Sequence, residues 1–100
     1  MSESDTDADL SRLRNEIERI DRELVKLIAQ RVSLARAVGF EKRSAGLPTL
    51  DPAREAAIIR RSGILAREAG LGEEDVREIF WHLVGLCRRA QLEALQEDRD

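Results

Sequence analysis

The sequence predicts an all-α protein with one long, one short and one medium helix, and two observations carry this prediction. Charged residues make up 37% of the 100 residues and hydrophobic residues 42%, whereas aromatic residues make up only 3%, which favours amphipathic helices around a small core. Apolar residues also recur at spacings of three and four, the period of a helix with one buried face. We expect one helical domain over residues 9–96, a disordered acidic tail at 1–8 and a frayed end at 97–100.

The first predicted helix runs from about Asp9 to Arg43 or Ser44, without a proline. At about 1.5 Å per residue it is roughly 50 Å long, more than a globule of this size covers. Its length therefore indicates a partner chain. The residues of its stripe are Leu10, Leu13, Ile17, Ile20, Leu24, Leu27, Arg31, Leu34 and Val38.

Local signals define the other two helices. Gly46 is expected to end the first helix in a left-handed conformation. Asp51 followed by Pro52 predicts the start of the second helix, with the aspartate as N-cap and the proline in the first helical position. A third helix is expected to begin near Glu73, because acidic residues favour a helix N-terminus.

Composition excludes several classes of protein. The net charge of −3 argues against a nucleic-acid binder or a protein of anionic membranes, and no apolar run is long enough to span a bilayer. The single cysteine, Cys87, cannot form an intrachain disulfide and fits a reducing compartment, so we expect a cytoplasmic protein. One histidine cannot build a metal site.

Arg31 is the exception in the apolar stripe. A guanidinium there loses hydration and needs an anionic partner, yet no acid occupies position 27, 28, 34 or 35. Lys42 lies about three turns further on nearly the same face, roughly 16 Å away. Arg14 lies about 25 Å before Arg31. If two copies of the helix pair antiparallel, Arg14 of one chain approaches Arg31 of the other, creating two equivalent cationic sites.

Further polar residues cluster on the other helices. Asp51, Arg54 and Glu55 share the first turn of the second helix, and Cys87 and Gln91 lie one turn apart on the third. Together with the cations of the first helix they suit a small dianion that carries a hydroxyl. The alternatives are structural: Asp51 as a helix cap, Glu55 paired on the surface with Arg54 or with the neighbours of Ile59, and Cys87 as a core residue.

The ordered set of these residues resembles the all-helical class of chorismate mutases, over about residues 10–95 and without gaps. The matching segments are Leu13–Ile17, Ile20–Leu24, Ala29–Arg31, Val38–Lys42, Asp51–Glu55 and the pair Phe80 and Gln91.

The resemblance implies an intertwined homodimer of three-helix chains in which the partner completes each active site. By position, Arg14 resembles the arginine supplied in trans, and Arg31 the carboxylate clamp supplied by the same chain. Lys42 and Gln91 resemble the pair that faces the ether oxygen of the substrate.

The resemblance also gives roles to the second helix. Asp51 and Glu55 resemble the residues near the ring hydroxyl, and Arg54 supports the carboxylate-binding side. Cys87 takes a place where the family often has a serine, and a thiol is a poorer hydrogen-bond donor than a hydroxyl.

The implied reaction is the rearrangement of chorismate to prephenate in aromatic amino-acid biosynthesis. This step is unimolecular and requires no nucleophile, metal or redox cofactor; the protein restrains a flexible dianion and opposes charge on the ether oxygen. The alternatives are a 4-amino-4-deoxychorismate mutase or an isochorismate-pyruvate lyase on the same scaffold. From another class, the chain could be a non-catalytic helical dimerisation or regulatory module. Whether the protein also binds a partner enzyme is a question that the sequence leaves open.

Overall fold

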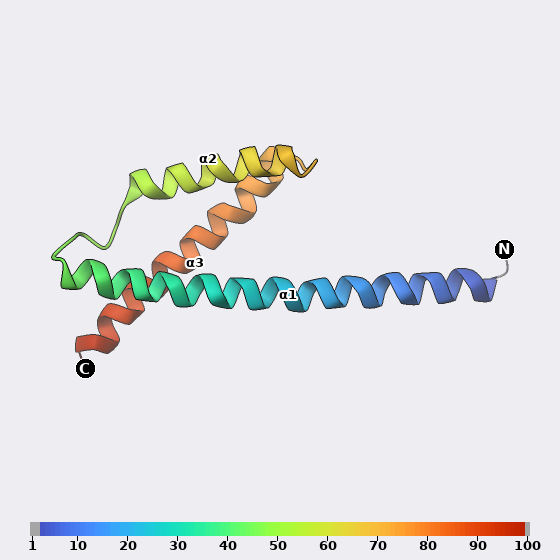
Figure 1. The fold of residues 1–100 in the computed structure, drawn as a ribbon, viewed down its shortest axis with the longest axis horizontal. Coiled ribbons are helices and arrows are strands. Elements are labelled where there is room, and N and C mark those ends of the chain that lie inside the picture. Colours follow the sequence, from blue (N-terminus) through green and yellow to red (C-terminus); the bar gives the residue numbers. More distant parts are fainter. Residues whose placement is uncertain (1–2, 100) are drawn as a thin grey trace. The chain divides into compact units, whose positions relative to one another are not determined.

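The computed structural model describes the backbone of residues 3–99 and the side chains of residues 3–96. Within these residues the chain forms three helices and no strand: α1 (Glu3–Ser44), α2 (Pro52–Glu68) and α3 (Glu73–Arg99), shown in Figure 1. The predicted all-helical class is confirmed, as is the order of a long, a short and a medium helix. None of the helices in this part of the chain is long and apolar enough to cross a membrane.

Two predicted boundaries are wrong. Helix α1 begins at Glu3 rather than near Asp9, with Glu3 and Asp5 in its first turn, where negative charge favours the helix dipole. Helix α3 continues to Arg99, beyond the predicted end at residue 96, because no glycine or proline interrupts its last turns. Residues 1, 2 and 100 of the two predicted tails lie outside the described residues.

Helices α1 and α2 both end at a glycine in the left-handed conformation. Gly46 has φ +69° and Gly70 has φ +74°. After the first of these, the backbone N–H of Leu47 donates to the carbonyl of Lys42 at 2.8 Å. This closing pattern is typical of a glycine helix stop, and it confirms the predicted end of α1 at Gly46.

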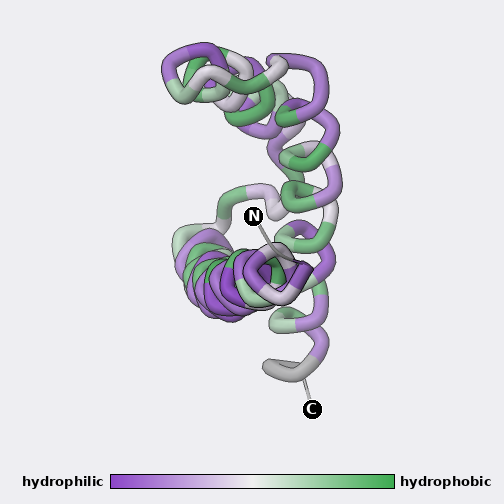
Figure 2. Tube along the Cα trace, turned by 90° about the vertical axis from the view of Figure 1, so that its right-hand side faces the viewer, coloured by the Kyte–Doolittle hydropathy of each residue, from purple (hydrophilic) through white to green (hydrophobic). Residues whose placement is uncertain are grey.

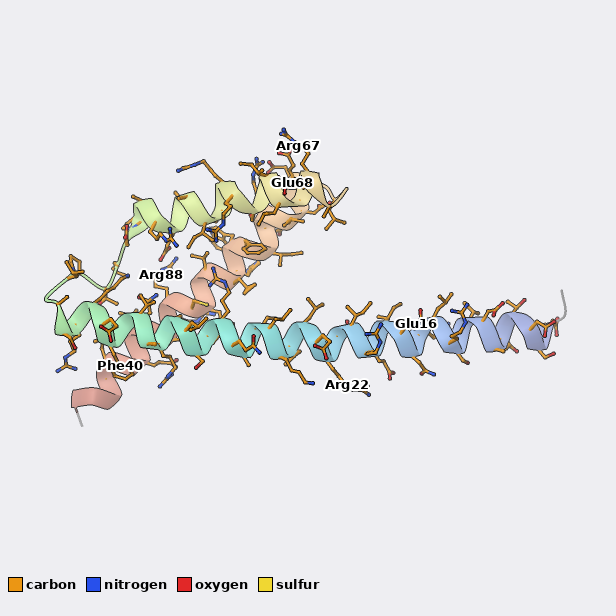
Figure 3. All side chains as sticks on the ribbon, viewed as in Figure 1. Glu16, Arg22, Phe40, Arg67, Glu68 and Arg88 are labelled. Carbon is orange, nitrogen blue, oxygen red and sulfur yellow. The ribbon has the colours of Figure 1, made fainter. Side chains whose placement is uncertain are left out.

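The chain consists of two compact units, Met1–Gln30 and Arg31–Asp100. The first unit is the N-terminal part of α1, and its apolar stripe is exposed, with values between 42% and 58% of each residue's surface. Surface ion pairs occur along the same segment. Glu16 and Arg22, which belong to two different pairs, are labelled in Figure 3. The stripe residues concerned are Leu10, Leu13, Ile17, Ile20, Leu24 and Leu27.

The second unit holds the core. Small side chains dominate it, and Figure 2 shows hydrophobic segments recurring turn by turn along α3. Ser62 of α2 is completely buried, and its hydroxyl donates to the carbonyl of Ile59 at 2.6 Å, which satisfies its polar atom. Because these side chains are small, the helix backbones of this unit can approach one another closely. The buried apolar residues are Ala35, Ala66, Val84, Cys87, Ala90 and Ala94.

Candidate active site

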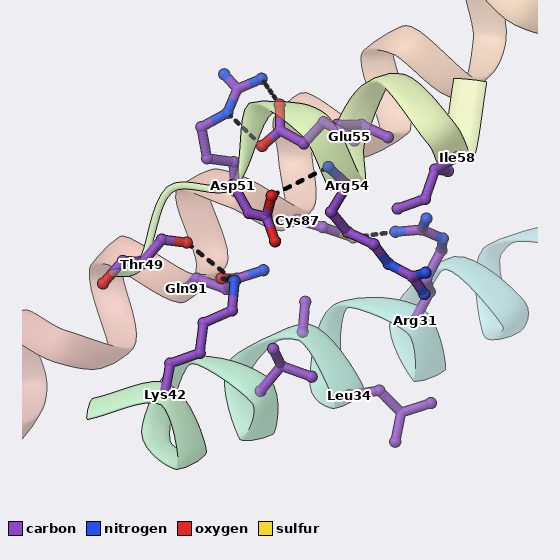
Figure 4. Close-up of a pocket in the computed structure, with 14 residues that line it drawn as sticks. Arg31, Leu34, Lys42, Thr49, Asp51, Arg54, Glu55, Ile58, Cys87 and Gln91 are labelled. Atoms are coloured by element: carbon purple, nitrogen blue, oxygen red, sulfur yellow. Dashed lines mark hydrogen bonds and ion pairs between the residues drawn. The ribbon is translucent and has the colours of Figure 1, made fainter. Parts of the chain in front are cut away.

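A pocket of about 480 Å³ lies within the second unit, between the C-terminal turns of α1, the following loop, the start of α2 and one face of α3. Its volume falls in the range of small-molecule sites. Seven of the eight predicted site residues line it, and Figure 4 shows them around one space. They are Arg31, Lys42, Asp51, Arg54, Glu55, Cys87 and Gln91. Arg14, the eighth, is exposed and belongs to the first unit.

Arg31 meets a thiol rather than a carboxylate. Its Nη1 donates to Sγ of Cys87 at 2.9 Å, and within the described residues it forms no ion pair. Cys87 is only 4% exposed, which confirms it as a core residue, but its sulfur also faces the pocket-lining guanidinium. The charge of Arg31 is therefore available to an anionic ligand.

Lys42 is held over the pocket by two oxygen atoms. Its ammonium group donates to the carbonyl of Thr49 at 3.0 Å and to Oε1 of Gln91 at 3.4 Å, as Figure 4 shows. Because Gln91 accepts this bond through its oxygen, its NH₂ group remains a donor for a ligand. The sequence pattern did not indicate Thr49, which contributes a backbone carbonyl from the loop after Gly46.

Asp51 both caps α2 and lines the pocket. Its Oδ1 accepts a hydrogen bond from the backbone N–H of Arg54 at 3.0 Å, and Pro52 is the first residue of α2, so the predicted N-cap is confirmed. The same carboxylate also lines the pocket. Figure 4 shows the Arg54 side chain extending toward the end of the pocket where Arg31 lies.

Glu55 pairs with Arg88, so the alternative in which it pairs with Arg54 on the surface is wrong. Arg88 reaches from α3 to the first turn of α2, with Nε–Oε2 at 3.0 Å and Nη2–Oε1 at 2.6 Å. These hydrogen bonds lower the pKa of Glu55 against the opposing effect of burial, and they raise the pKa of Arg88. The sequence pattern did not indicate Arg88, although it follows Cys87 and lines the same pocket from α3.

The charge of the pocket suits an anion. Four cationic side chains and two carboxylates line it, which leaves a formal excess of two positive charges. Apolar residues form the wall between them, and such a wall strengthens electrostatic interactions by excluding water. Among the side chains of residues 3–96, no group of three or more histidine, cysteine, aspartate or glutamate residues is placed to hold a metal ion. The apolar residues are Leu34, Ala35, Val38, Ile58 and Val84.

The fold and the site together define an all-helical protein with a pocket whose charge suits a small anion. Comparison with known protein families identifies the family, because residues 13–92 match the one described as chorismate mutase type II. The chain belongs to this family.

Individual relatives agree with the family match. The chain is 35% identical over 91 residues to the chorismate mutase of Methanocaldococcus jannaschii, covering 91% of this chain and 92% of that protein. It is 37% identical over 71 residues to the T-protein of Haemophilus influenzae, covering 71% of this chain but only 19% of the much longer relative. A solved structure of a conserved hypothetical protein from Pyrococcus furiosus matches with a TM-score of 0.68 and 31% identity, over 83% of this chain and 95% of that one.

Proposed function

We propose that this protein is a chorismate mutase that converts chorismate to prephenate. The observation that carries the proposal is the grouping of Arg31, Lys42, Arg54 and Gln91 around one apolar-walled pocket. Family membership and the nearly full-length similarity to a chorismate mutase support it.

The proposed mechanism needs only restraint and electrostatics. Arg31 and Arg54 hold the substrate carboxylates, and the apolar wall compresses the flexible molecule into its reactive conformation. Lys42 and the NH₂ group of Gln91 donate to the ether oxygen, where negative charge grows as the C–O bond breaks. Because Gln91 needs no protonation to donate, activity is expected near neutral pH, and a requirement for acid would count against its role.

We propose that a second copy of this chain packs against the exposed apolar stripe of the first unit. Its six stripe residues are at least 42% exposed, and in proteins most of a helix's stability comes from packing of its amphipathic face rather than from intrinsic propensity. Antiparallel pairing of two such helices would bury both stripes. It would also bring Arg14 of each chain toward the pocket of the other, which gives each site its further cation.

Mixing two inactive variants tests function and assembly together. Arg14→Ala and Lys42→Ala are each expected to lose several orders of magnitude in turnover while keeping their helical circular dichroism. In a randomly reassociated equimolar mixture, half of the dimers carry one intact site, so about a quarter of wild-type activity should return. Chorismate loss is followed by its ultraviolet absorbance, and Arg22→Ala, which removes an exposed arginine paired with Glu18, is the control.

Each outcome of this experiment has a definite meaning. No recovery in a mixture of proven dimers contradicts the supply of Arg14 in trans, and monomers in analytical ultracentrifugation contradict the assembly. Full activity of Lys42→Ala contradicts the mechanism. Parallel assays with isochorismate and 4-amino-4-deoxychorismate separate the proposed reaction from its alternatives, and a non-catalytic module would turn over none of the three.

A further inference from the structure

The pair of Glu55 and Arg88 is a feature of the pocket that the proposed mechanism does not use. Arg88 holds both carboxylate oxygens of Glu55 from the neighbouring helix, as the dashed lines at Glu55 in Figure 4 show. The side chain of Arg88 is 41% exposed and that of Glu55 is 25% exposed. Each carboxylate oxygen still has a lone pair that can accept one more hydrogen bond. Glu55 therefore remains an acceptor, although its charge is compensated.

The charged groups around Glu55 come from all three helices. Lys42 faces it from α1, Asp51 lies one turn before it at the N-cap of α2, and Arg88 faces it from α3. Arg54 follows Asp51 along the pocket wall. If Arg88 were absent, the carboxylates of Asp51 and Glu55 would face only the ammonium group of Lys42, and this local excess of negative charge would attract a further cation.

A hydroxyl and an amine on a ligand respond differently to this arrangement. A hydroxyl is neutral and needs only a lone pair to receive its proton. A primary amine is protonated near pH 7, so its ammonium form gains from each uncompensated carboxylate and is repelled by each uncompensated cation. The charge balance at Glu55 therefore sets the preference between the two groups.

We propose that Arg88 is a specificity-determining residue, which makes this end of the pocket accept a neutral ring hydroxyl in preference to an ammonium at the same position. The inference rests on the proposed function and refines it toward chorismate and away from 4-amino-4-deoxychorismate. Arg88 acts through Glu55 and touches no reacting atom.

The test compares kcat/KM for chorismate with kcat/KM for 4-amino-4-deoxychorismate at pH 7. Arg88→Met removes the guanidinium that compensates the charge of Glu55, so the ratio of the two kcat/KM values in favour of chorismate should fall about tenfold or more. Arg88→Lys keeps the positive charge and should largely keep this ratio, even if loss of the two-point guanidinium contact lowers both kcat/KM values. Arg89→Met, which removes the neighbouring exposed arginine outside the pocket, should leave both rates unchanged.

A variant with the opposite charge change covers the possibility that Arg88→Met does not fold. Glu55→Gln leaves Arg88 uncompensated, so the ratio should move further toward chorismate. A purely structural pair would lower both kcat/KM values equally in every variant, and an unchanged ratio in Arg88→Met or Glu55→Gln overturns the inference. If the wild-type protein converts neither substrate, the proposed function itself fails, and the two failures are thereby distinguished.

Discussion

Gly39 provides a sensitive test of the spacing between α1 and α3 at the pocket. A Cβ atom added there would lie 3.3 Å from both Cα and the carbonyl oxygen of Gln91, and 3.4 Å from its Cβ. Two of these three atoms are backbone, so they cannot rotate away. Gly39→Ala should therefore push α1 and α3 apart by a few tenths of an ångström at Gln91, a residue that the proposed mechanism uses.

The size of the effect follows from that displacement. Overpacking of this kind costs about 1–3 kcal/mol, and replacing a helical glycine returns about 0.5–1 kcal/mol, so the net loss of stability should lie between about 0 and 2.5 kcal/mol. The bond from Lys42 to Gln91 is already 3.4 Å long, so further separation breaks it. Since a single preorganised donor contributes about 10²–10³ to turnover, a partial displacement should lower kcat by about tenfold to a hundredfold.

The assay is steady-state chorismate turnover, with urea denaturation for the free energy of unfolding. Gly85→Ala is the matched control, because a Cβ there meets only the end of the Arg89 side chain, at 3.5 Å; it should keep kcat and gain a little stability. If Gly39→Ala is folded and has wild-type kcat, the assigned role of the Lys42–Gln91 spacing is wrong.

Three further predictions concern single side chains. Cys87→Ser should raise kcat/KM a few-fold in steady-state assays, because a hydroxyl binds the Arg31 guanidinium better than a thiol does; a lower value would show that the site is fitted to sulfur. Asp51→Ala should cost about 1 kcal/mol in chemical denaturation, whereas Asp51→Asn, an equally good cap, should cost almost nothing; equal losses would exclude capping as the cause. Arg88 lowers the folded-state pKa of Glu55, so the pair's stabilisation is complete above the unfolded pKa of about 4.3 and is lost as the pH falls through the lowered folded value. The stability difference between wild type and Glu55→Gln should thus shrink between pH 6 and pH 3, and a constant difference would contradict this linkage.

Local chemistry explains which parts of the fold were predictable. Asp51 and Pro52 define the start of α2, and Gly46 defines the end of α1, through interactions between residues close in sequence. The outer ends of α1 and α3 lack such signals. There the helix continues as long as nothing interrupts it, and the predicted boundaries at Asp9 and residue 96 were therefore wrong.

Helical periodicity also accounts for much of the pocket. Arg31 and Lys42 lie about three turns apart on one face, and Cys87 and Gln91 lie one turn apart on another, so the sequence alone groups each pair. The pairing of Glu55 could not be found in this way. Its partner is one of 17 lysine and arginine residues and lies 33 positions away, and only the packing of α2 against α3 selects it.

The charge of the pocket favours an enzyme over a dimerisation module. A module needs the apolar stripe of α1, and an isolated polar residue such as Arg31 would suffice to set its register. The structure instead gathers four cations and two carboxylates around one space. The cations in excess of the carboxylates repel one another, which opposes folding, so such clusters are typical of sites where function outweighs stability. A bound dianion would cancel the pocket's formal excess of two positive charges.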